Sequence, residues 1–483
     1  MNAELTTKTK TTAKVLDSKR WLMLAAALGA TLMGAIDIFI VNVAIPTIQH
    51  ELHTGFAEMQ LISAGYTLAN AALLVLGGRL GDLYGRKRLF LIGVGAFTAF
   101  SALCGFAPDP LLLIVFRVLQ GTAAAMMTPQ VFSLIQDNFS SQERPVAMSA
   151  YAATLGLASV VGMVLGGGLI VANVLGMGWR SIFLINVPFG LIVLVASILF
   201  IKESREPATH TLDYGGVALL TLALVFFTFP LIMGGNTGWP LWTIICLPLS
   251  LPCVVAFWFY EQYTAKQGQE PLVSPELFKL HKFTAGNLTN LLDGSLWNGM
   301  IFLFSIYLQT GLHFTPLQSG LAMVVGSIAF ILASSASTLI LPRLGRRNIS
   351  IAACLVTINY ALVLLAAQYL EARWGVFPIL IAFFVLCFSH ALLYTPLMPK
   401  TVEEVTAAHV GAASGIYTTT LEISGTLGVA IIGLIYAVLT ISGTGIALAF
   451  VLTMAFIALL SAGTIFLVRP LEGHKPHASN TTM

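Results

Sequence analysis

Four ionisable side chains lie well inside long apolar segments of this chain. The acids are Asp37, Asp293 and Glu422, and the cation is Arg117. A charged side chain at the centre of a membrane helix costs about 2.5 to 3.5 kcal/mol on insertion scales, so each needs a cavity, a partner or a function. A carboxyl group in such surroundings resists ionisation unless a cation lies near it. These residues therefore indicate reversible proton binding or recognition of a positively charged compound.

Asp37 lies about two-thirds of the way along the first apolar segment, too deep to reach the membrane surface. We hypothesise that Asp37 exchanges a proton with a cationic substrate and that Arg117 lies close enough to bias its ionisation. The alternative is a purely structural ion pair between the two side chains.

Asp293 shares a helix face with Trp297, because the two residues are one helical turn apart, and Asn290 extends the same stripe. An acid beside an aromatic face suits a lipophilic cation, which gains Coulomb attraction and a cation–π contact together. The alternative is a polar stripe that only bonds to neighbouring helices. His390 is a candidate proton relay, or else a histidine that forms a helix contact.

Glu422 lies among Thr and Gly residues, which suggests close helix packing around a polar cavity. We predict a second protonation or substrate site there, and the alternative is a neutral, hydrogen-bonded glutamic acid. Tyr66 and Asn70, one turn apart, are further candidates for lining the cavity, with plain packing as the alternative.

The composition indicates what positions these residues. The 483-residue chain is 57% hydrophobic and only 9% charged, whereas soluble domains carry about a quarter charged residues. Reading segments of about 20 apolar residues predicts about fourteen membrane spans and an all-α membrane protein. No aqueous domain of any size remains, so we expect the function to be carried out within or across the bilayer.

The Lys and Arg residues predict the orientation. Of the 24, 21 fall on one side of the predicted spans, two on the other, and Arg117 lies inside a span. Cytoplasmic loops collect positive charge, so both termini are predicted to be cytoplasmic, in a multi-pass protein of the cell membrane. The net charge of +3 is then a result of topology and gives no indication of nucleic-acid binding.

Other kinds of chemistry have little support. The five cysteines fall in apolar segments and predict no disulfide framework. His50 and His53 have a spacing that suits a metal, but no third ligand is evident. No nucleotide-binding loop or hydrolase motif is present, so we expect no cofactor, no metal and no enzyme activity. The expected partners are a small molecule, protons and the bilayer, and the protein is expected to be a monomer.

The spans are arranged as six, two and six. A tail over 1–20 precedes a six-helix half over 21–201, a linker with two further helices over 202–282, a second six-helix half over 283–468 and a tail over 469–483. Two halves with a substrate site at their interface are a common transporter plan, in which the halves rock to expose the site alternately.

The short segment 78–88, with the sequence GRLGDLYGRKR, joins the second and third spans. Its glycines, Gly78 and Gly85 among them, permit unusual backbone dihedrals, and the helix dipole favours Asp82 near a helix start. The segment 341–347, LPRLGRR, takes the same place in the second half but lacks the acid.

The motifs together resemble the major facilitator superfamily, specifically its fourteen-span drug:proton antiporters, over nearly the whole chain. The segment 78–88 is similar to the family's cytoplasmic loop motif, in which Asp82 and Arg86 would latch the two halves in one state. Three further segments resemble motifs of the first, fourth and sixth spans: 37–46 (DIFIVNVAIP), 117–121 (RVLQG) and 179–188 (WRSIFLINVP).

The antiporter motif of the fifth span is present but altered. Gly156, Gly162, Gly166 and Gly167 fit it, whereas Met163 stands where the family usually has Pro. The resemblance implies the major facilitator fold and proton-coupled export of hydrophobic, cationic compounds, with Met163 leaving antiport and symport open. A carrier for a specific metabolite or a self-made antibiotic would share every motif, and a membrane-embedded protein without transport activity is the remaining alternative.

Overall fold

The computed structural model describes residues 19–140, 143–203, 213–267, 271–370, 374–406 and 410–472. Helices account for nearly all of these residues, and no strand occurs within the described ranges. Thirteen of the described helices are long and apolar enough to cross a membrane. The second expected span corresponds to a further continuous helix, α2 (Phe56–Tyr84). The prediction of an all-α membrane protein is confirmed.

The N-terminal half contains seven helices. They are α1 (Lys19–Leu52), α2, α3 (Arg86–Gly105), α4 (Pro110–Asn138), α5 (Arg144–Ala172), α6 (Ser181–Leu184) and α7 (Asn186–Phe200). The start of α4 illustrates how the sequence fixes a helix end. The Asp109 carboxylate accepts a hydrogen bond from the Leu112 amide at 2.9 Å, and Pro110 occupies the first helical position.

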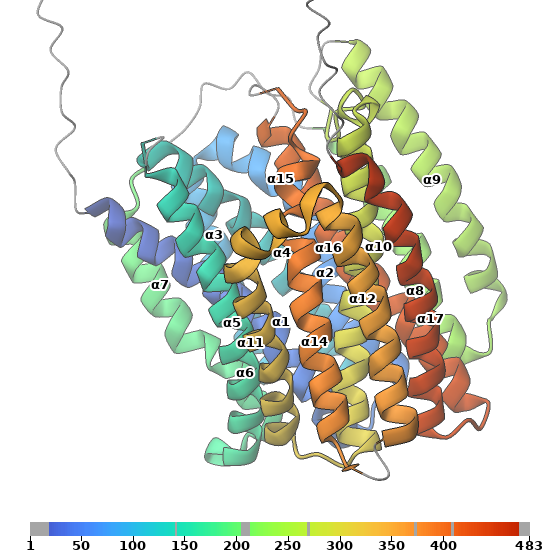
Figure 1. Cartoon of the computed structure of the whole chain (residues 1–483). Helices are drawn as coiled ribbons and strands as arrows, with labels where there is room; N and C mark the ends of the chain where they lie inside the picture. The colour runs from blue at the N-terminus through green and yellow to red at the C-terminus, as the bar shows by residue number, and fades with distance from the viewer. Residues whose placement is uncertain are drawn as a thin grey trace, which may run out of the picture.

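Two helices, α8 (Tyr214–Thr237) and α9 (Leu241–Lys266), connect the halves. Asp213 caps α8 by accepting a hydrogen bond from the Gly216 amide at 2.8 Å. α8 packs on α2, on α16 of the C-terminal half and on α9. α9 packs chiefly on α8 and forms the right-hand edge of the molecule in Figure 1.

The C-terminal half begins after this linker. Its helices are α10 (His281–Ile306), α11 (Pro316–Arg343), α12 (Asn348–Leu365), α14 (Phe377–Tyr394), α15 (Leu397–Thr401), α16 (Val410–Ile441) and α17 (Ile446–Leu467). π-Helical turns extend α10 over Tyr307–Gly311 and α12 over Ala366–Leu370. Short 3-10 turns lie at Val174–Gly176, Gly178–Arg180, Leu277–Lys279, Gly345–Arg347 and Arg469–Leu471.

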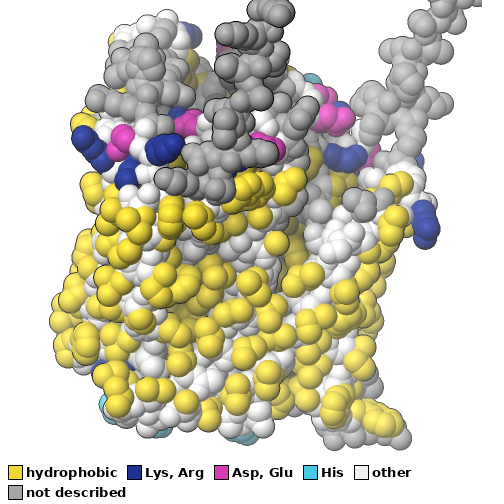
Figure 2. All heavy atoms as spheres, turned by 90° about the vertical axis from the view of Figure 1, so that its left-hand side faces the viewer, with side chains coloured by type: hydrophobic (Ala, Val, Ile, Leu, Met, Phe, Trp, Pro, Cys, Tyr) yellow, Lys and Arg dark blue, Asp and Glu magenta, His cyan; other side chains and the backbone are white. Residues whose placement is uncertain are grey.

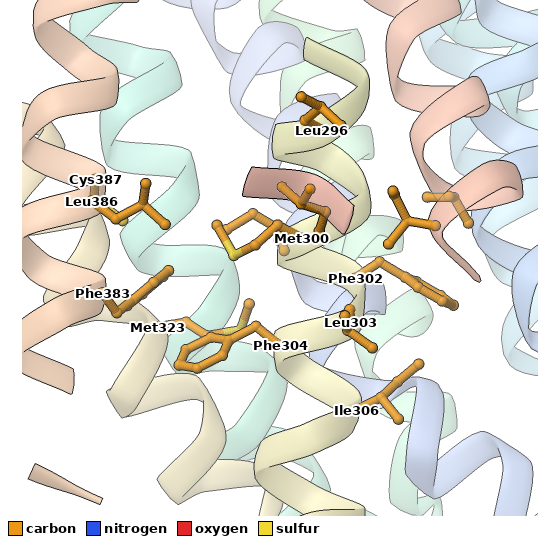
Figure 3. Close-up of a cluster of buried hydrophobic side chains, with 14 of the residues drawn as sticks. Leu296, Met300, Phe302, Leu303, Phe304, Ile306, Met323, Phe383, Leu386 and Cys387 are labelled. Atoms are coloured by element: carbon orange, nitrogen blue, oxygen red, sulfur yellow. The ribbon is translucent and has the colours of Figure 1, made fainter. Parts of the chain in front are cut away.

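Apolar side chains fill the centre of the C-terminal half. Figure 3 shows Met300 and Phe304 of α10 beside Met323 of α11 and Phe383 of α14, and all four are buried. The rings of Phe304 and Phe383 lie 4.5 Å apart. This packing fixes the position of α10, which carries Asp293 about two to three turns further toward its start.

The surface matches a protein surrounded by lipid. Figure 2 shows a broad hydrophobic band, with Lys, Arg, Asp and Glu side chains gathered at one end of the visible face. Two seams join the halves, one between α5 and α11 and the other between α2 and α16. Of the ionisable residues, Glu422 lies on a seam helix, α16, whereas α1, α4 and α10 carry Asp37, Arg117 and Asp293.

Candidate functional site

Asp37 and Arg117 form a buried ion pair inside the N-terminal half. The Arg117 guanidinium donates hydrogen bonds to Oδ2 of Asp37, to Oε1 of Gln120 at 2.8 Å and to the Ile62 carbonyl at 3.1 Å. Oδ1 of Asp37 accepts from Gln120 at 2.9 Å and from Asn186 at 3.1 Å. Asp37 is 0% exposed and Arg117 1% exposed. The expected proximity is therefore present, and in this conformation each charged group has several hydrogen-bond partners.

Tyr66 completes this cluster. The Arg117 guanidinium lies 4.5 Å from the centre of the Tyr66 ring, close enough for a cation–π interaction. The other side of the guanidinium lies 5.8 Å from the Phe183 ring. Tyr66 is buried, so the structure places it against the ion pair.

Asp293 has a partner that the sequence did not predict. Its Oδ2 lies 2.9 Å from Nε2 of His390, which comes from α14. The expected neighbour, Trp297, stacks on the imidazole with ring centres 3.9 Å apart and an angle of 6° between the planes. The Asp293–Trp297 stripe is present, and an imidazole of the chain lies against it.

Asn290, the third member of that stripe, connects α10 to α16. Its amide donates to the Tyr417 carbonyl at 3.0 Å, and its side chain is buried. This contact corresponds to the alternative in which the stripe bonds to a neighbouring helix.

Glu422 lies at the seam between the halves. Its carboxyl group lies close to the Asn70 side chain of α2, and one turn away Thr426 donates to Thr67 at 3.1 Å. Glu422 is half-buried, whereas Asp37 and Asp293 are fully buried. Among the four predicted ionisable residues, Glu422 alone combines a cross-half contact with a partly accessible side chain.

Two tyrosines extend the polar surroundings of Glu422. Tyr151 of α5 and Tyr394 of α14 both lie within electrostatic range of its carboxyl group, and both are half-buried. Tyr151 packs on Phe132 with ring centres 4.7 Å apart. Side chains from α2, α5, α14 and α16 therefore surround one acid where the halves meet.

The loop motif is more helical than expected. α2 continues to Tyr84 and α3 begins at Arg86, so Gly85 alone breaks the helices, with φ +107°, which favours glycine. Arg86 donates to both carboxylate oxygens of Asp137 in α4 at 2.5 and 2.6 Å. Both bonds come from Nη1 of the guanidinium, and the pair lies within one half.

Gly78 and Asp82 are two further residues of the motif. Gly78 packs against α4, where a Cβ would lie 3.5 Å from Pro129. The side chain of Asp82 lies outside the described part of the structure. The latch role of the motif stays a prediction.

A second polar contact holds the same end of the N-terminal half. Arg20 at the start of α1 donates to both oxygens of Glu143 at 2.8 and 2.6 Å. A hydrogen bond from the Ser140 hydroxyl, together with the Arg20 charge, holds the pKa of Glu143 below its ordinary value. Glu143 therefore stays ionised at neutral pH and ties α1 to the connection between α4 and α5.

The glycines of the fifth-span motif bring helices close together. A Cβ on Gly162 would lie 3.0 Å from the Ile36 carbonyl, and one on Gly166 would lie 3.1 Å from the Ile40 carbonyl, both in α1. On Gly167 it would lie 2.6 Å from the Pro316 carbonyl of the other half. Three positions of the motif thus lie at close helix contacts.

The two remaining positions of that motif face α11. A Cβ on Gly156 would lie 3.6 Å from Ile331. The Met163 sulfur accepts from Ser327 at 3.8 Å, and α5 runs without interruption from Arg144 to Ala172. The α5–α11 seam therefore follows this face of α5.

The halves also bond to each other at the end predicted to face outward. Gln60 donates to the Val429 carbonyl at 2.7 Å, Ser305 to the Asn42 carbonyl at 2.7 Å, and Gln309 to the Val43 carbonyl at 2.9 Å. The Phe56 ring packs against Phe302 and Tyr436 of the other half. These contacts close the predicted outer end in this conformation.

Sequence reasoning missed several partners in the site. Gln120 and Asn186 hold Asp37, and His390 holds Asp293. Gln120 carried a usable signal, because it lies one turn after Arg117 within the same apolar span. No comparable spacing connects Asp293 with His390.

Comparisons with known proteins agree with this arrangement. The chain is 32% identical over 420 residues to the "Probable actinorhodin transporter" of Streptomyces coelicolor, covering 87% of this chain and 73% of the relative. It is 30% identical to the "Tetracenomycin C resistance and export protein" of Streptomyces glaucescens, covering 88% and 78%.

A solved structure with a similar fold is that of a bacterial homologue of the human lysosomal transporter Spinster, inward-facing and unoccupied. The two structures superpose with a TM-score of 0.66 at 14% sequence identity. The alignment covers 95% of this chain and all of the other. The Major Facilitator Superfamily profile matches residues 27–233 and 214–429. The chain therefore belongs to the Major Facilitator Superfamily, as its motifs predicted.

Proposed function

We propose that this protein exports hydrophobic, positively charged antibiotics or other toxic compounds in exchange for protons, by alternating access. Two relatives are named for transport or export of actinorhodin and tetracenomycin C, which supports export of compounds of this kind. The two-half architecture supports rocking about a site at the interface.

Glu422 carries the proposal. It is a partly accessible acid at the seam, close to Asn70 of the opposite half and within electrostatic range of Tyr151 and Tyr394. A carboxylate near aromatic side chains attracts a lipophilic cation, and the same group neutralised by a proton loses the Coulomb part of that attraction. Competition between proton and substrate for one carboxyl group couples their opposite movements.

The buried ion pair at Asp37 has a different place in this scheme. In this conformation Arg117, Gln120 and Asn186 all donate hydrogen bonds to its carboxyl group. Proton exchange at Asp37 would then require a conformation in which Arg117 moves away. This role stays a prediction.

The further details of the proposal concern location and assembly. We place the protein in the cell membrane as a monomer that acts as a carrier and not as an enzyme, with both termini in the cytoplasm. The gathering of Lys and Arg at one end supports this orientation.

Inverted membrane vesicles with an acidic interior test the function. Ethidium added outside should accumulate in the vesicles, and nigericin, which dissipates the pH difference, should stop the accumulation. Glu422→Gln should abolish pH-driven accumulation because the side chain no longer binds a proton, and Glu422→Asp should keep part of it. The control is Glu276→Gln, at an exposed acid of the linker.

Accumulation that survives nigericin, or a Glu422→Gln protein that pumps at full rate, would overturn the proposal. If ethidium and other quaternary cations are ignored while tetracenomycin C or actinorhodin is pumped, the specific antibiotic carrier is favoured. The names of the two relatives support that second candidate.

A further inference from the structure

A second acid site lies in the C-terminal half, away from the seam. Asp293 is 0% exposed and His390 3% exposed, and the bond between them connects α10 to α14. If both groups were deprotonated, the pair would hold a full negative charge inside the membrane. One shared proton cancels that charge, whether it resides on the acid or on the imidazole.

Two aromatic rings lie parallel or nearly parallel to the imidazole. Trp297 stacks on it with ring centres 3.9 Å apart, and Tyr394 lies nearly parallel with ring centres 5.7 Å apart. A cation stacked on an aromatic ring and beside a carboxylate is stabilised by both. The position predicted for a substrate cation is thus occupied by His390.

The pair keeps atoms that can accept a proton. Nδ1 of His390 and Oδ1 of Asp293 are buried without a hydrogen-bond partner among the described residues, and so is the hydroxyl of Tyr360. When Nε2 of His390 donates to Asp293, Nδ1 is the basic nitrogen of the ring.

The titratable groups around the pair come from a few helices. From α11, the ring of Phe330 lies 6.1 Å from His390 but does not titrate, and α17 contains no titratable residue. Three tyrosines lie within electrostatic range of Asp293: Tyr360 of α12, Tyr394 of α14 and Tyr417 of α16. Tyr394 lies within electrostatic range of both Asp293 and Glu422.

We propose that Asp293 and His390 form a proton-binding site of the C-terminal half, in which His390 is the cation that Asp293 and Trp297 recognise. A proton adds to the neutral imidazole beside the Asp293 carboxylate and gives an imidazolium–carboxylate pair with no net charge. Release of the proton restores the neutral ring and the negative pair. The part this site plays in transport rests on the proposed proton-coupled export, whereas protonation of the pair does not.

Trp297 provides a direct readout, because an imidazolium stacked on an indole quenches its emission and a neutral imidazole quenches it less. The protein would be purified in detergent, without substrate or proton gradient, and its emission titrated from about pH 4 to 10. The Trp297 contribution is the difference between the unaltered protein and Trp297→Phe, which keeps an aromatic ring for stacking.

We expect this contribution to fall as the pH is lowered and the transition to disappear in His390→Gln. In Asp293→Asn the midpoint should move to lower pH by about 1 to 3 units, because the carboxylate that stabilises the imidazolium is gone. The control is Glu276→Gln, at the exposed acid of the linker, which should leave the midpoint within about half a unit because an exposed charge is screened by solvent.

A Trp297 contribution that does not change with pH would overturn the proposal, as would a transition that persists in His390→Gln or is unmoved by Asp293→Asn. Native-like thermal unfolding of each variant shows that a lost transition is not a folding defect. If vesicle transport proves independent of protons while this titration is observed, the export mechanism fails and the proton site stands.

Discussion

Gln60 offers a sharp test of how the predicted outer end is held closed. Its amide donates to the Val429 carbonyl at 2.7 Å, and its side chain is fully buried between the halves. Gln60→Leu removes this bond while keeping similar volume. The Val429 carbonyl keeps its helical partner because α16 is continuous, so no acceptor is stranded.

The size of the effect follows from the number of such bonds. A buried hydrogen bond contributes about 0.5 to 1.5 kcal/mol net. Loss of the Gln60 bond should shift the equilibrium between the outer-closed and outer-open states by roughly 2- to 12-fold toward the open state. The bonds of Ser305 and Gln309 remain, so the closed state is weakened but not abolished.

Distances between spin labels measure these populations directly. Labels on cysteines at Val174 and Ser442, both exposed at the predicted outer ends of the two halves, should report a larger fraction of long distances in Gln60→Leu. Gln130→Leu is the matched control, because Gln130 is equally buried but bonds to the Gly77 carbonyl within its own half. Equal populations in Gln60→Leu and the unaltered protein, or the same shift in the control, would refute the reasoning.

Two further predictions concern packing and the buried ion pair. Gly167→Ala should strongly reduce transport in the same vesicle assay, because the added Cβ meets backbone of the other half. Gly168→Ala is the control and should transport normally, because nothing lies within 4 Å of a Cβ at that position. Asp37→Asn and Arg117→Met should each destabilise the fold by about 3 to 5 kcal/mol, because each leaves a buried charge without its partner. The double variant should lose much less than the sum, and additive losses in denaturant unfolding would argue against direct coupling.

The sequence was sufficient for some of the site and not for the rest, for physical reasons. Asp37 and Arg117 could be paired in advance because each is an isolated charge within an apolar span. Opposite charges inside a membrane usually lower their energy by pairing with each other. His390 was ambiguous because an imidazole can be neutral, and helix periodicity does not say which face of α14 meets α10. Gln60 and Gln309 were missed because a glutamine that bonds to a distant carbonyl leaves no local pattern.

The loop motif shows the same limit at shorter range. Its glycines predicted a tight connection, and the break is confined to Gly85. The partner of Arg86 is Asp137, which lies 51 positions further along the chain and has no signal in the motif itself.

The position of α8 makes the two flanks of the molecule unequal. It lies over the seam of α2 and α16, while the seam of α5 and α11 still exposes Leu157 and Ile328 to the surroundings. A compound dissolved in the lipid would therefore meet a screened flank on one side and a bare one on the other. Lateral entry from the bilayer would then be favoured at the seam of α5 and α11, whereas α8 and α9 would block it at the opposite seam.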